Sequence, residues 1–292
     1  MELRRPSVIV ALLTPFDEDG RFHESALSAH VDQLVDAGVD ALMPCGTTGE
    51  AALLSDEEVA EVVRATCAAA GDRVPVLAHV GRPGTAPTLE LARRAVADGA
   101  AAISAVVPYY YPIVSDALRA HYAALVEGLD GTSVYAYTIP DRTHNELEPV
   151  LLRQLIRDGL AGLKDSTKSI ERHQMYAAAV ASSDVERFEL LMGTASLVLE
   201  ALHGGSAGAV LALANVEPWR CVELARAFRE GSFREAEELQ QELVAAEREL
   251  QSEGVIPAMK RTVAARIHAY SPTLRAPLGT GGGVARAIRS KG

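Results

Sequence analysis

Cysteine is scarce in this sequence: its 292 residues include only Cys45, Cys67 and Cys221, and no two of them have CxxC spacing. Three unpaired cysteines make no disulfide framework and no structural zinc site, and they suit a reducing compartment. The eight histidines form no HxH or HExxH pattern, which disfavours a metal-dependent enzyme. We therefore expect a cytoplasmic protein without a metal site.

Long apolar runs and an excess of basic residues are also missing. The apolar stretch after the N-terminal arginines stops at Pro15, which is too short to span a membrane, and no small-residue cleavage site follows it. The net charge is −11, which argues against nucleic acid or an anionic membrane as a partner. We expect neither among the partners of this protein.

Apolar segments with the length of buried strands alternate with amphipathic segments through the first two thirds of the chain. Eight strands are expected, at residues 8–13, 41–44, 74–79, 102–107, 133–137, 160–164, 190–192 and 209–213. Strands joined by helical crossovers form a parallel sheet, and eight of them close a (β/α)8 barrel, the TIM barrel. The alternative is a doubly wound sheet, but the GxGxxG turn typical of that fold is absent after the first strand.

The alternation stops near residue 216. Residues 218–229, 232–251 and 256–269 are expected to form three further helices, and no Pro/Ser-rich linker separates them from the barrel. We therefore predict a barrel over residues 1–216 and a C-terminal helical extension, packed on the barrel, over residues 217–292.

Lys164 stands out because it directly follows a short apolar segment, Leu-Ala-Gly-Leu at 160–163, that reads as a buried strand. Burial disfavours the ammonium form and lowers the pKa of a lysine, so that its amine becomes a nucleophile able to form a Schiff base with a carbonyl. The alternative is an ion pair with Asp165 at the strand end. Because the ends of barrel strands carry the chemistry of this fold, the catalytic interpretation is favoured.

Tyr137 is expected beside Lys164, since the two residues lie at equivalent heights near the ends of adjacent strands. A phenol next to an amine can shuttle protons while a Schiff base forms. Tyr135 shares the same face of its strand by alternation, so either tyrosine could point into the barrel.

Further candidates follow other strands at the same end of the expected barrel. Residues 46–50 read Gly-Thr-Thr-Gly-Glu, where glycines let the backbone approach a ligand, although such clusters also serve as plain turns. Residues 108–112 read Pro-Tyr-Tyr-Tyr-Pro, a stiff loop suited to an interface, to a substrate wall or to simple packing. His79 could touch substrate, but packing explains it at least as well.

Arg142 lies five residues beyond Tyr137, in the loop at the expected barrel mouth. A guanidinium there can bind a carboxylate through two hydrogen bonds. The alternative is an arginine that is solvated or paired with Asp141. If Arg142 does bind a carboxylate, the second substrate is acidic.

Together these motifs resemble the dihydrodipicolinate synthase/N-acetylneuraminate lyase family of pyruvate-dependent class I aldolases. The similarity covers the whole chain in order: Thr-Pro-Phe at 14–16, Gly-Thr-Thr-Gly-Glu at 46–50, Pro-Tyr-Tyr at 108–110, Tyr-Thr-Ile-Pro at 137–140 and Gly-Leu-Lys-Asp at 162–165. Each motif alone is modest, but five in this order with about the right spacing are specific.

The resemblance implies roles for individual residues. Lys164 would form the Schiff base with pyruvate, without any other cofactor, and Tyr137 would be the acid and base. Thr47 would connect Tyr137 to Tyr110, a phenol that in the family comes from the neighbouring subunit. The pyruvate site would also include Thr47 and Thr48, which hold the carboxylate, Gly193 after the seventh strand, and the carbonyl of Val210 in the eighth. The implied partners are pyruvate and an aldehyde, and the implied assembly is a homotetramer built as a dimer of dimers.

Departures from the family pattern leave the second substrate open. Thr138 stands where the synthases often have asparagine, and His144 stands where they usually have glycine. Residues 51–56 and 81–84 lack the histidines and the asparagine of lysine-inhibited members, so inhibition by lysine is not expected. The expected activity is a dihydrodipicolinate synthase-like condensation of pyruvate with aspartate semialdehyde. The alternatives are a related aldolase for 4-hydroxy-2-oxoglutarate or a 2-keto-3-deoxy sugar acid and, from another class, a non-catalytic barrel that binds a 2-oxo acid.

Overall fold

A computed structural model describes residues 5–183, 185 and 187–279. Its strands are β1 (Ser7–Ala11), β2 (Ala41–Met43), β3 (Leu77–His79), β4 (Ala102–Val106), β5 (Ser133–Thr138), β6 (Gly162–Asp165), β7 (Glu189–Met192) and β8 (Gly208–Leu211). The helices of the barrel are α1 (Glu24–Asp36), α2 (Asp56–Ala70), α3 (Thr85–Ala97), α4 (Ser115–Gly128), α5 (Pro140–Thr143), α6 (Pro149–Arg157), α7 (Ile170–Ala181) and α8 (Val198–His203). Three 3-10 turns, η1 (Ala51–Leu53), η2 (Ala195–Leu197) and η3 (Leu213–Asn215), follow strand ends.

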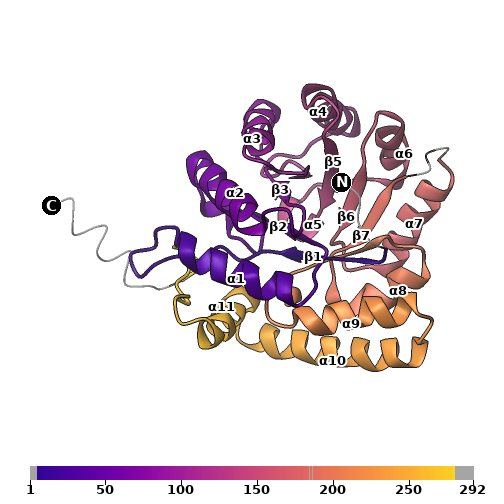
Figure 1. The fold of residues 1–292 in the computed structure, drawn as a ribbon. Helices are drawn as coiled ribbons and strands as arrows, with labels where there is room; N and C mark the ends of the chain where they lie inside the picture. The colour runs from indigo at the N-terminus through magenta and orange to yellow at the C-terminus, as the bar shows by residue number, and fades with distance from the viewer. Residues whose placement is uncertain (1–4, 184, 186, 280–292) are drawn as a thin grey trace.

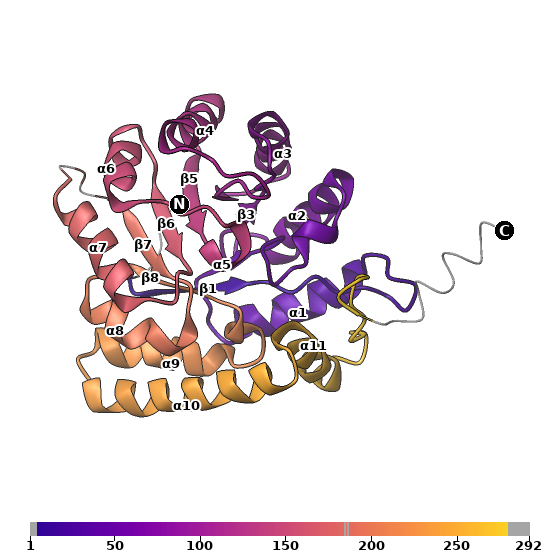
Figure 2. The same ribbon diagram turned by 180° about the vertical axis from the view of Figure 1, so that it is seen from behind.

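The eight strands are parallel and close into a barrel. Their order is β2-β1-β8-β7-β6-β5-β4-β3, and a parallel bridge between Leu42 and Val76 joins the two outer strands. At this seam the Leu42 N–H donates to the carbonyl of Pro75 at 3.1 Å. Figures 1 and 2 show the strands inside a ring of helices, with the short helix α5 near the centre of the ring. The TIM barrel predicted from the sequence is confirmed.

Alternation of side chains along the strands gives the barrel two cores. One apolar cluster lies inside it and includes Ile9, Met43, Leu77, Leu191 and Val210. Larger clusters fill the space between the outer faces of the strands and the surrounding helices. Functional side chains that point inward at the strand ends therefore rest on a packed apolar floor.

Three helices follow the barrel: α9 (Pro218–Arg229), α10 (Phe233–Ser252) and α11 (Val255–Arg266). α9 and α10 pack side by side near β1 and α8, and α11 continues beside α1 (Figures 1 and 2). The division into a barrel over residues 1–216 and a packed helical extension over residues 217–292 stays a prediction, and residues 280–292 lie outside the described chain. Among the described helices, none combines the length and the apolar character that a membrane crossing requires.

Several element boundaries differ from the expected ones for local reasons. β3 begins only at Leu77, because Pro75 has no N–H to offer a neighbouring strand. α11 ends at Arg266 instead of residue 269, because Ile267 is extended and the chain turns back toward the barrel mouth. The segment after β5 was expected to be a loop, but Pro140 starts a four-residue helix there, and this helix carries Arg142.

Candidate active site

Lys164 lies deep in the barrel at the carboxyl end of β6. Only 5% of the residue is exposed, and burial lowers the pKa of its amine to about 7. The Nζ atom lies 4.2 Å from the centre of the Tyr137 ring. Asp165 does not form the ion pair considered from the sequence: its carboxylate accepts from His173 Nδ1, at 2.8 Å, and from the Thr167 N–H. Lys164 is thus a desolvated amine beside a phenol.

Tyr137 is the neighbour of Lys164 across the sheet. The two residues are register partners on β5 and β6, as their positions in the sequence predicted. The Tyr137 hydroxyl lies 3.3 Å from Thr47 Oγ1. Burial raises the pKa of the Tyr137 phenol, and hydrogen bonds to Thr47 and Ser166 partly oppose this shift. A phenol with a raised pKa stays protonated at neutral pH and can donate its proton.

Tyr135 lies two residues earlier on the same inward face, in the middle of β5. Its hydroxyl donates to Glu189 Oε2 at 2.7 Å, and Glu189 begins β7. The Tyr135 hydroxyl is thus bonded to Glu189, and the tyrosine beside the Lys164 amine is Tyr137.

The loop after β2 is held close to the strand ends by a short contact that requires glycine. Thr14 Oγ1 donates to the Gly49 carbonyl at 2.8 Å. A Cβ on Gly49 would come within 3.0 Å of the Leu12 carbonyl oxygen and 3.1 Å of Thr14 Oγ1, closer than ordinary packing allows. The two motifs at 14–16 and 46–50 thus act together, and Thr47 and Thr48 are held on this loop.

Gly193, at the end of β7, permits another close approach. Its N–H donates to the Asp165 carbonyl at 2.7 Å. An added Cβ would lie 2.0 Å from Ser166 Oγ, so that Ser166 would have to move away from Tyr137. Val210 lies inside the barrel on β8, in register with Ile9.

A cavity of about 340 Å³ opens at the same end of the barrel. Its lining includes Thr47 and Arg142 together with residues that the sequence did not identify as a group: Gly46, Glu50, Ala51, Ala52, Leu53, His79, Gly81, Arg82, Val106, Tyr109, Ile139, Thr143, Ile256, Pro277 and Leu278. Lys164 and Tyr137 are not among the lining residues, but Tyr137 contacts two of them, Thr47 and His79. The arrangement suits a small second substrate that approaches the amine from the cavity.

Arg142 is exposed and faces this cavity. Asp141 pairs instead with Lys168, at 2.7 Å. Within residues 5–279 as described, Arg142 forms no ion pair of its own. Its guanidinium is therefore available to a ligand, and the expected binding of a carboxylate stays a prediction.

His79 supports the site but does not offer a free ring nitrogen. Its Nδ1 lies 2.8 Å from the Cys45 carbonyl, and its Nε2 lies 3.2 Å from the Val106 N–H. These contacts fix a neutral ring, protonated on Nδ1, and burial lowers the pKa of His79 to about 3. The ring packs edge-to-face on Tyr137, with the centroids 5.9 Å apart. His79 thus packs against Tyr137 with both ring nitrogens engaged, and because it also lines the cavity, contact with substrate stays a prediction.

Tyr110 does not reach this centre within one chain. Its side chain is 82% exposed and contacts Tyr111 edge-on. Asn145 holds the loop in shape, because its Nδ2 donates to the carbonyls of Pro108 and Tyr111, both at 2.8 Å. The loop therefore presents phenols outward from a fixed backbone.

A buried ion pair behind the cavity was not anticipated from the sequence. Lys260 Nζ lies 2.5 Å from Glu50 Oε1, and neither side chain is exposed. The second oxygen of Glu50 accepts the Arg275 N–H at 2.8 Å, and Lys260 Nζ donates to the Thr273 carbonyl at 2.8 Å. This pair holds the segment after α11, with Pro277 and Leu278, against the cavity.

If Lys164 forms the imine expected from the sequence, its lowered pKa determines how imine formation depends on pH. With a pKa of about 7, the neutral nucleophilic fraction rises about tenfold from pH 6 to pH 8 and then levels off. His79 and Tyr137 do not titrate in this window, since their pKa values are shifted below and above it. Stopped-flow measurement of pyruvate binding should show a plateau above pH 8. A rate that still rises steeply above pH 9 would indicate an ordinary solvated lysine.

A TIM barrel with a desolvated lysine and a phenol side by side at its strand ends has the architecture of a Schiff-base-forming class I lyase. The model of the dihydrodipicolinate synthetase family matches residues 5–283. The chain belongs to this family, a family of pyruvate-dependent lyases that use a Schiff-base lysine and no separate cofactor. The described residues contain no cluster of three or more His, Cys, Asp or Glu side chains that could hold a metal ion.

Individual relatives agree with this assignment. The 4-hydroxy-tetrahydrodipicolinate synthase of Natronomonas pharaonis is 35% identical over 273 residues, which cover 93% of this chain and 90% of the relative. An uncharacterised DapA-like lyase of Halobacterium salinarum is 38% identical over 225 residues, or 77% of this chain and 72% of that one. Dihydrodipicolinate synthase from Aquifex aeolicus is 30% identical, with a TM-score of 0.86 over 99% of this chain and 98% of its own. YagE, a prophage protein of this family from Escherichia coli solved with pyruvate, is 25% identical, with a TM-score of 0.90 over 98% and 96%.

Proposed function

We propose that Lys164 is the Schiff-base lysine and that Tyr137 moves the protons of the reaction. The observation that carries this assignment is the contact between the buried Lys164 amine and the Tyr137 ring, at 4.2 Å. Burial shifts both pKa values toward the neutral forms, so the amine can attack while the phenol still holds its proton.

The reaction then follows ordinary imine chemistry. The neutral Lys164 amine adds to the C2 carbonyl carbon of pyruvate, and the resulting hydroxyl leaves as water with a proton supplied by Tyr137. Loss of a proton from C3 gives an enamine, whose C3 forms the new bond to the carbonyl carbon of the aldehyde. The aldehyde oxygen takes up a proton, and water or an internal amine releases the product from Lys164.

The remaining family roles are part of the same proposal. Thr47 and Thr48 would bind the pyruvate carboxylate, supported by a loop that Thr14 and Gly49 fix in place. Gly193 and the Val210 carbonyl would complete the pyruvate site from β7 and β8. Tyr110 would reach Thr47 of a neighbouring subunit, which agrees with its outward position on a rigid loop.

For the second substrate we propose an acidic aldehyde, with aspartate semialdehyde as in the synthase relatives. Arg142 supports this, because it faces the cavity without a carboxylate partner in the described structure. Two alternatives remain. One is a related 2-oxo acid aldolase that takes glyoxylate or a sugar-derived aldehyde, and the other is a barrel that binds pyruvate without turnover. The homotetramer and the cytoplasmic location stay predictions.

Replacing Arg142 by alanine tests the acidic acceptor. The KM for the preferred acidic aldehyde should rise about 10- to 100-fold, which is the loss of affinity expected when a hydrogen-bonded pair with a charged group is removed. Pyruvate trapping at Lys164 should be unchanged. The assay is turnover with saturating pyruvate and a panel of aspartate semialdehyde, glyoxylate and glyceraldehyde. A preference for glyceraldehyde that the substitution leaves intact would overturn the synthase-like assignment.

A further inference from the structure

We propose that Arg82 is a specificity-determining residue that binds an acid group of the aldehyde acceptor. The inference rests on the proposed function, in which the cavity beside Lys164 receives the acceptor. It goes further by assigning a second cationic contact to that cavity, in addition to Arg142, and by restricting the acceptor to aldehydes that carry a carboxylate or a phosphate.

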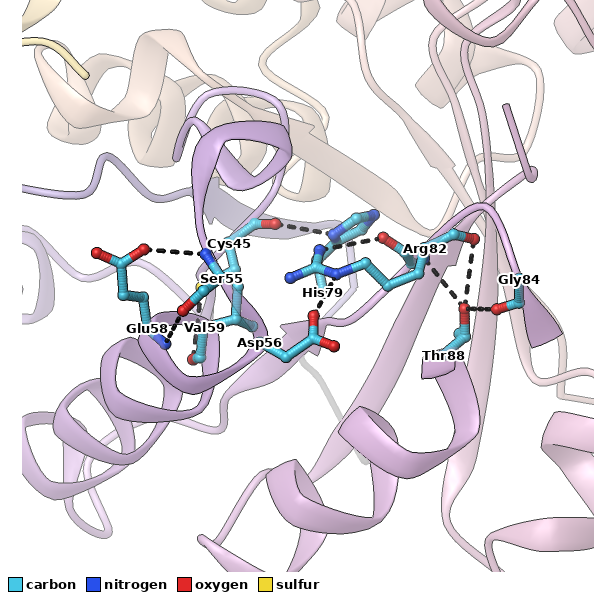
Figure 3. A network of polar contacts seen from close by, with 10 residues as sticks. Cys45, Ser55, Asp56, Glu58, Val59, His79, Arg82, Gly84 and Thr88 are labelled. Carbon is cyan, nitrogen blue, oxygen red and sulfur yellow. Dashed lines mark hydrogen bonds and ion pairs between the residues drawn. The ribbon is translucent and has the colours of Figure 1, made fainter. Parts of the chain in front are cut away.

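Arg82 is held in a fixed position by its own loop and by α2. Its N–H donates to Thr88 Oγ1 at 3.0 Å, and the same hydroxyl donates to the Gly84 carbonyl at 2.7 Å. Asp56, the first residue of α2, accepts from Nε at 2.7 Å. Figure 3 shows the guanidinium extended from this loop toward the segment that carries Cys45 and Ser55, near His79. The guanidinium is thus preorganised before a ligand arrives.

The two terminal amino groups of this guanidinium have few hydrogen-bond acceptors among the described residues. Nη1 has a single long contact, 3.4 Å to the Gly81 carbonyl. Nη2 is buried and has no hydrogen-bond partner among the described residues. The residue as a whole is only 9% exposed. A buried charged donor without an acceptor costs free energy. An acid group in the cavity that Arg82 lines would supply the missing acceptors.

The charge of the cavity favours the same ligand. Arg82 and Arg142 both line it. The only carboxylate on its described wall, Glu50, is neutralised by Lys260 and accepts the Arg275 N–H. His79 is neutral and has both ring nitrogens engaged. Arg82 is paired with Asp56 through Nε, so the charge on this wall that has no ion-pair partner among the described residues is that of Arg142, and it attracts an anionic substrate toward the free amino groups of Arg82.

Arg82→Met removes the charge and keeps most of the aliphatic length. Its former partner Asp56 has a side chain that is 44% exposed, so water can solvate the freed carboxylate and the fold should persist. Turnover is measured with saturating pyruvate and matched aldehydes: succinic semialdehyde against butanal, and glyceraldehyde 3-phosphate against glyceraldehyde. The first pair differs by a carboxylate and the second by a phosphate. Arg82→Lys, which keeps the charge, is the rescue variant.

We expect the KM for the acidic member of at least one pair to rise about 10- to 100-fold in Arg82→Met. The KM for the neutral partner and for pyruvate should stay the same, and Arg82→Lys should recover part of the loss. The pair affected identifies the acid group as a carboxylate or a phosphate. Equal KM changes for acidic and neutral aldehydes, or no KM change, would overturn the proposal. It would also be overturned if Arg82→Met lost inhibition by added anions while its KM for the acidic aldehyde stayed unchanged. Failure of pyruvate trapping in the unmodified protein would instead refute the proposed function itself.

Discussion

Replacing Lys164 by alanine is expected to reduce turnover by on the order of 10⁴-fold or more, because the covalent route to the product is lost with the amine. Lys164→Met should have the same effect while filling more of the buried space, which separates loss of the nucleophile from loss of packing. The measurement is steady-state turnover of pyruvate with the preferred aldehyde, together with the melting temperature of each variant.

Lys168→Ala is the matched control for this loss. Lys168 lies four residues further along the chain, is exposed, and pairs with Asp141. Exposed ion pairs contribute little to stability, so this variant should retain turnover close to that of the unmodified protein. Comparable losses at the two lysines would contradict the assignment of the amine.

Tyr137→Phe is expected to lower turnover by about 10²-fold or more, a typical contribution of a general acid and base. The ring, and with it the packing against His79, is retained, so the fold should persist. The measurement is kcat with both substrates saturating. Turnover near that of the unmodified protein would move the proton-transfer role to another phenol, such as Tyr110.

Tyr135→Phe provides the control two residues earlier on β5. Its hydroxyl donates to Glu189 at 2.7 Å, and neither residue lines the cavity. We expect a lower melting temperature, because a buried carboxylate loses a donor, while kcat changes little. The two tyrosines share one face of the strand by alternation in the sequence. Loss of the Tyr137 hydroxyl should nevertheless lower kcat, whereas loss of the Tyr135 hydroxyl should lower the melting temperature.

The fold could be predicted from the sequence because its signals are local and repeated. Short apolar segments alternate with amphipathic ones, and Gly38, Gly99 and Gly159 each end a helix with positive φ before a strand. The height of Tyr137 against Lys164 also followed from strand positions alone. Local signals failed at element boundaries, for example where Pro75 shortens β3, where Pro140 starts a short helix and where α11 ends early at Arg266.

The outer part of the site could not be predicted because it depends on contacts between distant segments. Glu50 and Lys260 form an ion pair although they lie 210 positions apart in the sequence. Neither position lies in a local sequence pattern that predicts a buried ion pair. Arg82 was noted only for what its segment lacks; its orientation depends on Asp56 and Thr88, which come from two different helices. Residues that act through such long-range contacts need a structure before their role can be argued.

Lys164 is tested most directly as the Schiff-base lysine by borohydride reduction in the presence of pyruvate, followed by peptide mapping by mass spectrometry. We expect one carboxyethyl adduct, on Lys164, which is absent from Lys164→Ala and present in Lys168→Ala. An adduct on Lys168 or Lys260, or no adduct at all in the unmodified protein, would contradict this assignment.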